Sequence, residues 1–360
     1  MSAKAVIISG GGTGGHIYPA LAVGRKLKER DPAVELTFVG TGREVERKIM
    51  EKSGLSFIPL RIEGLKGKGL KSLKSLFLLP SSFFQSAAIL KRLRPRLVIG
   101  AGGYSSGPIV LMASLRKIPT LILEQNVRPG LTNRLLRPWV RKAVVAFETT
   151  LPAFRGKGVL MGNPVRDEFY GLKPKERNGK LSLLIFGGSQ GSRFLNQAMT
   201  STLPLLVEEK SRLVIFHQTG SGDEEWVRKR YVENGFGEAT VAAYFHDMAA
   251  YFGKTDLVIS RAGATTIAEL IAGRKAAVLV PFAGAAEDHQ SWNARELERI
   301  GAADIILESE FSPELLARKI RRFLDDQDEI TAREKKLAAG QSDRPAERIA
   351  GLCLELMEGR

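Results

Sequence analysis

One local pattern occurs twice in this chain and restricts its fold more than any other feature. Residues 4–9 form a short apolar segment that leads into a glycine-rich loop at 10–15 and then into helically spaced apolar residues. Residues 181–186 lead in the same way into a loop at 187–192 and a helix predicted over 194–206. A buried strand, a glycine turn and a helix open a doubly wound, parallel α/β domain. Two copies predict two such domains.

Further strand-like segments follow each copy, and several of the spacers between them carry helical periodicity. This alternation predicts parallel sheets covered by helices on both faces. The predicted strands are 34–39, 57–62, 97–99, 120–123, 143–147 and 159–161 in the first half, and 213–216, 240–245, 257–259, 277–280 and 304–307 in the second.

The length of 360 residues also favours two domains. We expect residues 1–163 to form the first domain and 164–340 the second, with a last segment, 341–360, whose helix packs back on the first domain. Ligands of doubly wound domains bind beyond the carboxyl ends of the strands. A ligand held between the two domains is therefore expected.

The composition limits the partners. A formal net charge of +15 and a pI near 9.9 call for an anionic partner, which is nucleic acid, an acidic membrane surface or a phosphorylated substrate. A single cysteine, Cys353, excludes an internal disulfide framework. No segment has the pattern of a signal peptide or a membrane span, so a cytosolic or peripheral protein is expected. Nucleic acid is disfavoured, because the chain has no recognisable module and no basic residues interleaved with exposed aromatics.

Residues 256–270 predict an anion site. A strand at 257–259 is followed by a loop of small residues and a helix that opens at Thr265 or Thr266. The N–H groups and the dipole of such a helix start favour phosphate. Glu269, one turn further, can accept both hydroxyls of a ribose. The pair Thr266 and Glu269 also has the spacing of a capping box, in which Glu269 serves only its own helix.

The first glycine loop permits a second interpretation. Its glycines satisfy the dinucleotide fingerprint G-x-G-x-x-G, which makes a nicotinamide-dependent oxidoreductase an alternative. The strand at 34–39 is followed by Gly40, Thr41 and Gly42, whereas that class needs an acidic residue there. His16 stands at the helix start, where the dipole disfavours imidazolium, so the neutral ring is a candidate general base or an ordinary helix-start histidine.

No metal site is predicted. The only Asp-x-Asp sequence, Asp326 to Asp328, lies in a charged run between helices and is interpreted as solvated surface. No other cluster has the spacing of metal ligands.

Residues 66–96 carry eight basic residues and no acidic one. Two interpretations stay open: a pair of helices with an apolar core side and solvated lysines, or a face that contacts an anionic membrane. The residues proposed for the membrane contact are Lys68, Lys71, Lys74, Leu76, Phe77, Phe83 and Phe84.

Eight stretches occur together in a fixed order along the chain: GGGTGGHIYPALA at 10–22, GLKGKG at 64–69, GGYSSGP at 102–108, EQN and GLTNR within 124–134, GNPVR at 162–166, GGSQGS at 187–192, RAGATTIAEL at 261–270 and DHQSWNA at 288–294. In these stretches the chain resembles the MurG family. Its members are GT-B glycosyltransferases that add N-acetylglucosamine (GlcNAc) to the undecaprenyl-linked muramyl-pentapeptide of bacterial cell-wall synthesis.

The resemblance implies an inverting, metal-independent transfer from UDP-GlcNAc to the C4 hydroxyl of the muramyl sugar, without a cofactor. It places Glu269 on the ribose, main chain near Phe245 on the uracil, and His16, or alternatively Glu124, as the general base. The remaining donor groups would be Thr13, Gly14 and Gly15 at the reacting centre, Ser189, Ala264, Thr265, Thr266 and Arg166 on the diphosphate, and Asn126, His289 and Gln290 on the sugar. The acceptor would contact Gly12, Gly102, Gly103 and Tyr104.

The resemblance also implies a peripheral location on the cytoplasmic face of the bacterial inner membrane, with the lipid acceptor and an anionic membrane surface as partners and with contacts to other cell-wall synthesis proteins. A different glycosyltransferase that makes glycolipids from UDP-sugars, or an enzyme that modifies UDP-GlcNAc, would share the fold and the donor loops. The acceptor side would distinguish these alternatives.

Overall fold

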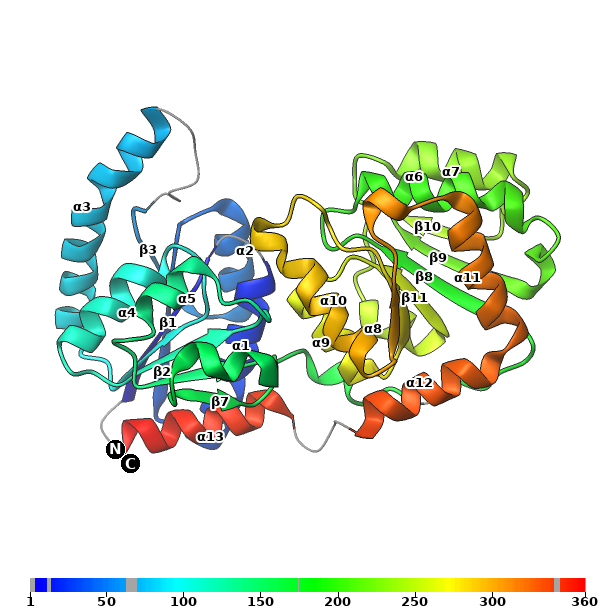
Figure 1. The fold of residues 1–360 in the computed structure, drawn as a ribbon. Helices are drawn as coiled ribbons and strands as arrows, with labels where there is room; N and C mark the ends of the chain where they lie inside the picture. Colours follow the sequence, from blue (N-terminus) through cyan, green and yellow to red (C-terminus); the bar gives the residue numbers. More distant parts are fainter. Residues whose placement is uncertain (1–3, 12–13, 63–69, 174, 340–343, 360) are drawn as a thin grey trace. The chain divides into compact units, whose positions relative to one another are not determined.

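The structure, a computed structural model, describes all residues except 1–3, 12–13, 63–69, 174, 340–343 and 360 (Figure 1). The chain forms two compact units, residues 1–165 with 343–360, and residues 166–342.

The first unit is built on a seven-stranded parallel sheet with the order β3-β2-β1-β4-β5-β6-β7. Its strands are β1 (Lys4–Ser9), β2 (Val34–Gly40), β3 (Ser56–Pro59), β4 (Leu97–Gly100), β5 (Thr120–Glu124), β6 (Lys142–Val145) and β7 (Gly158–Leu160). Its helices are α1 (Gly14–Arg30), α2 (Glu44–Ser53), α3 (Leu70–Leu93), α4 (Ser106–Leu115), α5 (Leu131–Leu136), the 3-10 helix η1 (Glu148–Phe154) and α13 (Pro345–Met357).

Both faces of this sheet are covered. Val6 and Ile8 of β1 pack into one apolar cluster, and Ile7 between them packs into the other. Successive side chains of a strand point to opposite faces, so a strand buried on both sides reads as a continuous apolar run. The first cluster includes α13, whose Ile349 and Cys353 are fully buried. The C-terminal helix is thus part of the core of the first unit.

The second unit is built on a six-stranded parallel sheet with the order β10-β9-β8-β11-β12-β13. Its strands are β8 (Leu181–Phe186), β9 (Leu213–Gln218), β10 (Thr240–Ala242), β11 (Leu257–Ser260), β12 (Ala276–Leu279) and β13 (Ala303–Ile305). Its helices are α6 (Arg193–Thr202), α7 (Glu224–Glu233), α8 (Met248–Lys254), α9 (Ala264–Gly273), α10 (His289–Arg299), α11 (Pro313–Asp325) and α12 (Gln327–Ala339), and its 3-10 helices are η2 (Asp167–Phe169), η3 (Leu203–Leu206), η4 (Lys210–Arg212), η5 (Ala286–Asp288) and η6 (Glu308–Glu310).

The prediction of two doubly wound α/β domains is confirmed, while several element boundaries were wrong. The predicted helix 194–206 is α6 followed by η3, which has proline at its start, where a proline N–H is not required. The predicted strand 240–245 ends at Ala242. Two helices were weighed within 66–96. The described part of that range, from residue 70 onward, has one helix, α3, with Pro80 inside it.

Each sheet has one point at which the strand order reverses, between β1 and β4 in the first unit and between β8 and β11 in the second. Ligands of open α/β sheets bind beyond the carboxyl ends of the strands at such points. The loops there are the two glycine loops of the sequence, together with residues 101–104 and 261–263. The fold therefore marks one candidate site in each unit.

Candidate active site

The loop after β11 ends at the start of α9. Gly263 is the N-cap with extended backbone, and it has no side chain with which to cap the helix. The helix begins at Ala264, one or two residues before the predicted start at Thr265 or Thr266. The Oγ1 atom of Thr265 is buried and has no hydrogen-bond partner among the residues that the structure describes. A helix start with a glycine N-cap, beside an unsatisfied hydroxyl, can bind phosphate oxygens.

Glu269 lies on α9 with 14% of its side chain exposed, and its Oε1 is 3.8 Å from Nη2 of Arg166. Burial raises the pKa of Glu269 to about 7, and the nearby Arg166 opposes this shift. The capping-box interpretation is wrong, because Thr266 lies inside the helix and Gly263 holds the N-cap position. A largely buried carboxylate beside a cation is a candidate binding group.

Arg166 belongs to the second unit, directly before η2. Its side chain is 42% exposed, and its guanidinium lies 5.1 Å from the centre of the Phe169 ring. The Phe169 ring and the Glu269 carboxylate together hold the guanidinium near α9. A positive charge next to a helix N-terminus adds to the attraction for a diphosphate.

The glycine loop after β8 packs closely on the loop after β9. A Cβ atom on Gly191 would lie 2.0 Å from the carbonyl oxygen of Thr219, so only glycine fits there. Ser192 caps α6 by accepting from the Leu195 N–H at 3.4 Å. Ser189, at the tip of this loop, is exposed.

No role was predicted for Arg261 from the sequence. Its side chain joins the loops after β8 and β11 at the point where the strand order reverses. Its Nε donates to Ser192 Oγ at 3.1 Å, and its Nη1 donates to the carbonyl oxygens of Val280 and Pro281 at 3.1 and 3.2 Å. Glu308 balances its charge at 2.5 Å. Its partners come from three separate stretches of chain, so no local pattern could have identified this role.

Gln290 lies in the first turn of α10, next to the half-buried His289. Its Oε1 accepts from the N–H groups of Ala262 at 3.2 Å and Phe282 at 3.0 Å. With its oxygen engaged, the carboxamide has its NH₂ group left to donate to a ligand. Gln290 is thereby held against the loop after β11, where a sugar hydroxyl can accept from it.

Phe245 is buried, and its ring stacks on Tyr251 with centres 3.8 Å apart. Its backbone N–H donates to Oε1 of Gln218 at 2.8 Å, which explains why the chain has left the sheet here. In the second unit, the structure thus brings Phe245, Ser189, Glu269 and Gln290 to the loops at the carboxyl ends of the strands.

In the first unit, His16 is the third residue of α1 and is half-buried. A Cβ atom on Gly102 would lie 2.8 Å from its Nδ1, and one on Gly103 would lie 2.4 Å from the carbonyl oxygen of Gly11. Both glycines have positive φ, 96° and 79°. The loops after β1 and β4 therefore meet in a way that only glycine permits, and His16 lies at their contact.

The other acceptor-side predictions lie around this contact. Tyr104 is 36% exposed and follows the two glycines. Gly14 and Gly15 open α1. Gly12 and Thr13 lie outside the described residues.

Glu124 ends β5 and is 3% exposed. Its Oε1 accepts from the Asn126 N–H at 3.0 Å, and its Oε2 accepts from the Gly130 N–H at 3.0 Å and Asn133 Nδ2 at 2.8 Å. Burial raises its pKa, and these hydrogen bonds oppose the rise. Both oxygens are engaged within the loop, so Glu124 is better suited to holding Asn126 in place than to removing a proton.

We expect Glu124→Gln to destabilise the protein by about 1–3 kcal/mol, because an amide group would turn an NH₂ toward donors that now bond to a carboxylate. Urea denaturation measures this, with Glu148→Gln on the exposed start of η1 as the matched control. Unchanged stability together with lost turnover would restore Glu124 as the base.

No role was predicted for Glu46 from the sequence either. It is 1% exposed and accepts from Thr41 Oγ1 at 2.8 Å and the Gly42 N–H at 2.9 Å. Glu46 thus holds the loop that follows β2. A nicotinamide dinucleotide site needs a carboxylate at this place to bind the ribose, whereas the Glu46 carboxylate bonds to its own loop.

The Asp-x-Asp sequence is surface, as predicted. Asp326 is exposed, and its Oδ1 accepts from the N–H groups of Asp328 at 3.1 Å and Glu329 at 3.2 Å, which caps α12.

Comparison with known proteins identifies the family of the chain. Residues 6–145 match the Glycosyltransferase family 28 N-terminal domain, and residues 182–349 match the Glycosyltransferase family 28 C-terminal domain. A protein of Myxococcus xanthus named UDP-N-acetylglucosamine--N-acetylmuramyl-(pentapeptide) pyrophosphoryl-undecaprenol N-acetylglucosamine transferase is 44% identical over 98% of this chain and 93% of its own length. A protein of the same name from Anaeromyxobacter sp. (strain K) is 44% identical over 99% of this chain and 94% of its own length.

Solved structures agree on the fold. The crystal structure of Acinetobacter baumannii MurG has a TM-score of 0.81 and 29% identity over 98% of this chain and 99% of that chain. A UDP-GlcNAc 2-epimerase from Neisseria meningitidis, 12% identical over 99% of this chain and 100% of that chain, has a TM-score of 0.67 and shares the fold alone. The expected GT-B fold is confirmed. The chain belongs to glycosyltransferase family 28 and, within it, to the MurG family of N-acetylglucosaminyltransferases.

Proposed function

We propose that this protein transfers GlcNAc from UDP-GlcNAc to the C4 hydroxyl of the muramyl sugar in undecaprenyl-pyrophosphoryl-MurNAc-pentapeptide, as a step of peptidoglycan synthesis. The observation that carries the proposal is the position of Glu269 on α9, beside Arg166, in a helix whose N-cap is Gly263. This combination offers a carboxylate to a ribose and cationic and backbone donors to a diphosphate. The names of the relatives supply the sugar and the acceptor.

In this proposal the donor binds to the second unit. Glu269 accepts the ribose hydroxyls, main chain near Phe245 meets the uracil, and Gln290 with His289 holds the sugar. The diphosphate lies at the start of α9, at Ala264, Thr265 and Thr266, with Ser189 and Arg166. Asn126 of the first unit is assigned to the sugar.

Departure of UDP places negative charge on the diphosphate. The positive end of the α9 dipole and the guanidinium of Arg166 would stabilise that charge as it develops. Because these groups are fixed before the reaction, they need no reorganisation during it. The proposal therefore assigns the leaving-group stabilisation to protein groups.

His16 is assigned to the acceptor. A neutral imidazole can take the proton of the attacking hydroxyl, and Tyr104, Gly102 and Gly103 lie at or beside its loop contact. Attack on the anomeric carbon from the side opposite UDP converts an α-linked donor into a β-linked product. A single displacement thus predicts inversion.

Transfer of labelled GlcNAc tests the function. We expect transfer from UDP-GlcNAc to the polyprenyl-linked muramyl-pentapeptide, and none to glycolipid acceptors that lack a muramyl sugar. Transfer to another glycolipid, or conversion of UDP-GlcNAc without an acceptor, would replace this function by one of the alternatives. Binding of a nicotinamide dinucleotide without a response to UDP would favour an oxidoreductase.

We further propose that the protein binds peripherally to an anionic membrane through its first unit. Among the described residues, no helix is long and apolar enough to cross a bilayer. On α3, Phe84 is 78% exposed and Phe83 is half-buried. Lys68 lies outside the described residues, as do the side chains of Lys71, Lys74, Leu76 and Phe77. An exposed aromatic on a helix without acidic residues suits the surface of an anionic bilayer.

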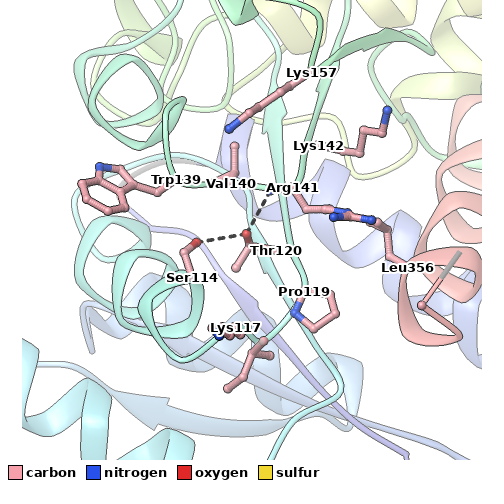
Figure 2. A pocket seen from close by; sticks show the side chains of 12 residues that line it. Ser114, Lys117, Pro119, Thr120, Trp139, Val140, Arg141, Lys142, Lys157 and Leu356 are labelled. Carbon is pink, nitrogen blue, oxygen red and sulfur yellow. Dashed lines mark hydrogen bonds between the residues drawn. The ribbon is translucent and has the colours of Figure 1, made fainter.

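A basic cavity of about 620 Å³ lies at the amino-terminal ends of β5 and β6 (Figure 2). Glu124 lies at the opposite, carboxyl end of β5. It has no acidic lining residue, and Trp139 at its wall is 53% exposed. Arg116, at the end of α4, donates to the carbonyl oxygen of Ala87 on α3 at 2.9 Å. The cationic residues that line the cavity are Lys117, Arg141, Lys142 and Lys157. The contact of Arg116 with α3 adds a positive charge beside that helix, which supports the membrane contact.

We expect the triple substitution Lys68→Glu, Lys71→Glu and Lys74→Glu to abolish sedimentation with anionic vesicles, because each surface lysine contributes up to about 1 kcal/mol. The affinity for UDP should stay unchanged. The control is Lys173→Glu, Lys229→Glu and Lys335→Glu, the same charge change at exposed positions of the second unit. Unaltered vesicle binding by the folded α3 variant would place the membrane face elsewhere.

A further inference from the structure

Gln218 is the last residue of β9, and its buried carboxamide bonds to the chain on both sides of that strand. Its Nε2 donates to the carbonyl oxygen of Gly188 at 3.0 Å, and its Oε1 accepts from the N–H of Phe245 at 2.8 Å. Gln218 is 1% exposed. In the sheet, β9 lies between β8 and β10. Gly188 follows the first of these neighbours and Phe245 follows the second, so one side chain spans the two segments.

The chemistry of the partners fixes the orientation of this amide. A carbonyl oxygen requires the NH₂ group, and a backbone N–H requires the amide oxygen. A flipped carboxamide would place two oxygens together at Gly188 and two N–H groups together at Phe245. Both hydrogen bonds therefore depend on a glutamine, and a carboxylate can make only the bond to Phe245.

Hydrogen bonds join the loop after β9 to the end of β10 and to α6. The Thr219 N–H donates to the Ala242 carbonyl oxygen, and the Gly220 N–H donates to that of Ala243, each at 3.0 Å. Asn196 on α6 donates to the Thr219 carbonyl oxygen at 2.9 Å.

The neighbouring His217 forms part of the same support. Because Asn196 Nδ2 is used as a donor, its Oδ1 accepts from His217 Nε2 at 3.0 Å, and His217 Nδ1 accepts from the Tyr231 hydroxyl at 3.1 Å. Burial lowers the pKa of His217 to about 3, so its ring is neutral. Gln218 thus extends from a fixed support toward the two segments.

We propose that Gln218 is a positioning residue that sets the spacing between the diphosphate-binding glycine loop and the uracil-binding main chain at Phe245. The inference rests on the proposed function, which assigns those two roles. A nucleoside diphosphate engages both segments at once, whereas a nucleoside engages only one. Holding the two segments at the correct separation before binding favours the ligand that spans them.

The test compares the affinities of UDP and uridine in two variants of the full chain. In its ionised form, Gln218→Glu keeps the acceptor for the Phe245 N–H and loses the donor to Gly188. We expect its UDP dissociation constant to rise by about tenfold and its uridine dissociation constant to change by less than about twofold. Gln218→Met loses both bonds at nearly the same size, so both affinities should fall, that for UDP by the larger factor.

Two controls separate positioning from general destabilisation. Gln197→Met removes an exposed glutamine from α6, and Met199→Ala destabilises the buried core of the same unit. Neither should change the ratio of UDP to uridine affinity in the folded protein. An equal loss for UDP and uridine in both Gln218 variants, or unchanged UDP affinity, would overturn the inference. Absence of UDP binding to the wild-type protein would instead refute the proposed function.

Discussion

Replacing His16 with alanine is expected to lower kcat by roughly 100-fold or more and to leave the dissociation constant of UDP-GlcNAc within about threefold of the wild type. His16 lies at the contact between the loops after β1 and β4, in the first unit. The proposed donor groups lie mainly in the second unit. A general base acts only while the acceptor hydroxyl loses its proton, so its loss affects turnover far more than donor binding.

Single-turnover measurements with saturating donor separate the effect of His16→Ala on the chemical step from an effect on product release. Nearly full turnover, or a loss of donor binding as large as the loss of kcat, would reject His16 as the base.

Replacing Glu269 with alanine is expected to weaken UDP-GlcNAc binding by about 100-fold, since two hydrogen bonds to a charged carboxylate together contribute about 3 kcal/mol. The fold should survive, because Glu269 does not cap α9. Isothermal titration measures the affinity. Glu238→Ala removes an exposed carboxylate from the same unit and is the matched control.

The elevated pKa of Glu269, about 7, adds a pH signature. The carboxylate accepts hydroxyl hydrogens better than the neutral acid does, so UDP affinity should increase between pH 6 and pH 8 and level off above, a rise that Glu269→Ala should lack. The folding stability of the ligand-free protein should respond to pH in the opposite direction and fall as pH rises. The folded state keeps a proton between the unfolded pKa and about 7, so this group lowers stability as pH rises through that window. Lost stability with unchanged donor affinity would contradict the assignment to the ribose.

The architecture was accessible from the sequence because its signals are local. Apolar runs of strand length followed by glycine loops identified β1 and β8, and the small residues at 260–264 identified the start of α9 to within one or two residues. Backbone preferences and periodicity act over a few neighbouring residues, so a single sequence reports them directly.

The interactions that define the roles of individual side chains were not accessible in this way. Glu124 was considered as a base from its place at a strand end, yet its role follows from Asn126, Gly130 and Asn133, which fold back on it. Gln218 and Arg261 bond to segments that are distant along the chain. The end of β10 was misplaced for the same reason, since Gln218 takes the Phe245 N–H. Such partners become neighbours only when the sheet assembles.

The structure of the transferred product tests the central claim most directly. The enzyme is incubated with UDP-GlcNAc and the polyprenyl-linked muramyl-pentapeptide, and NMR spectroscopy determines the anomeric configuration and the linkage position of the new sugar. The account predicts one product, in which GlcNAc is β-linked to C4 of the muramyl sugar. An α-linkage, attachment at another hydroxyl, or release of free GlcNAc in place of transfer would contradict it.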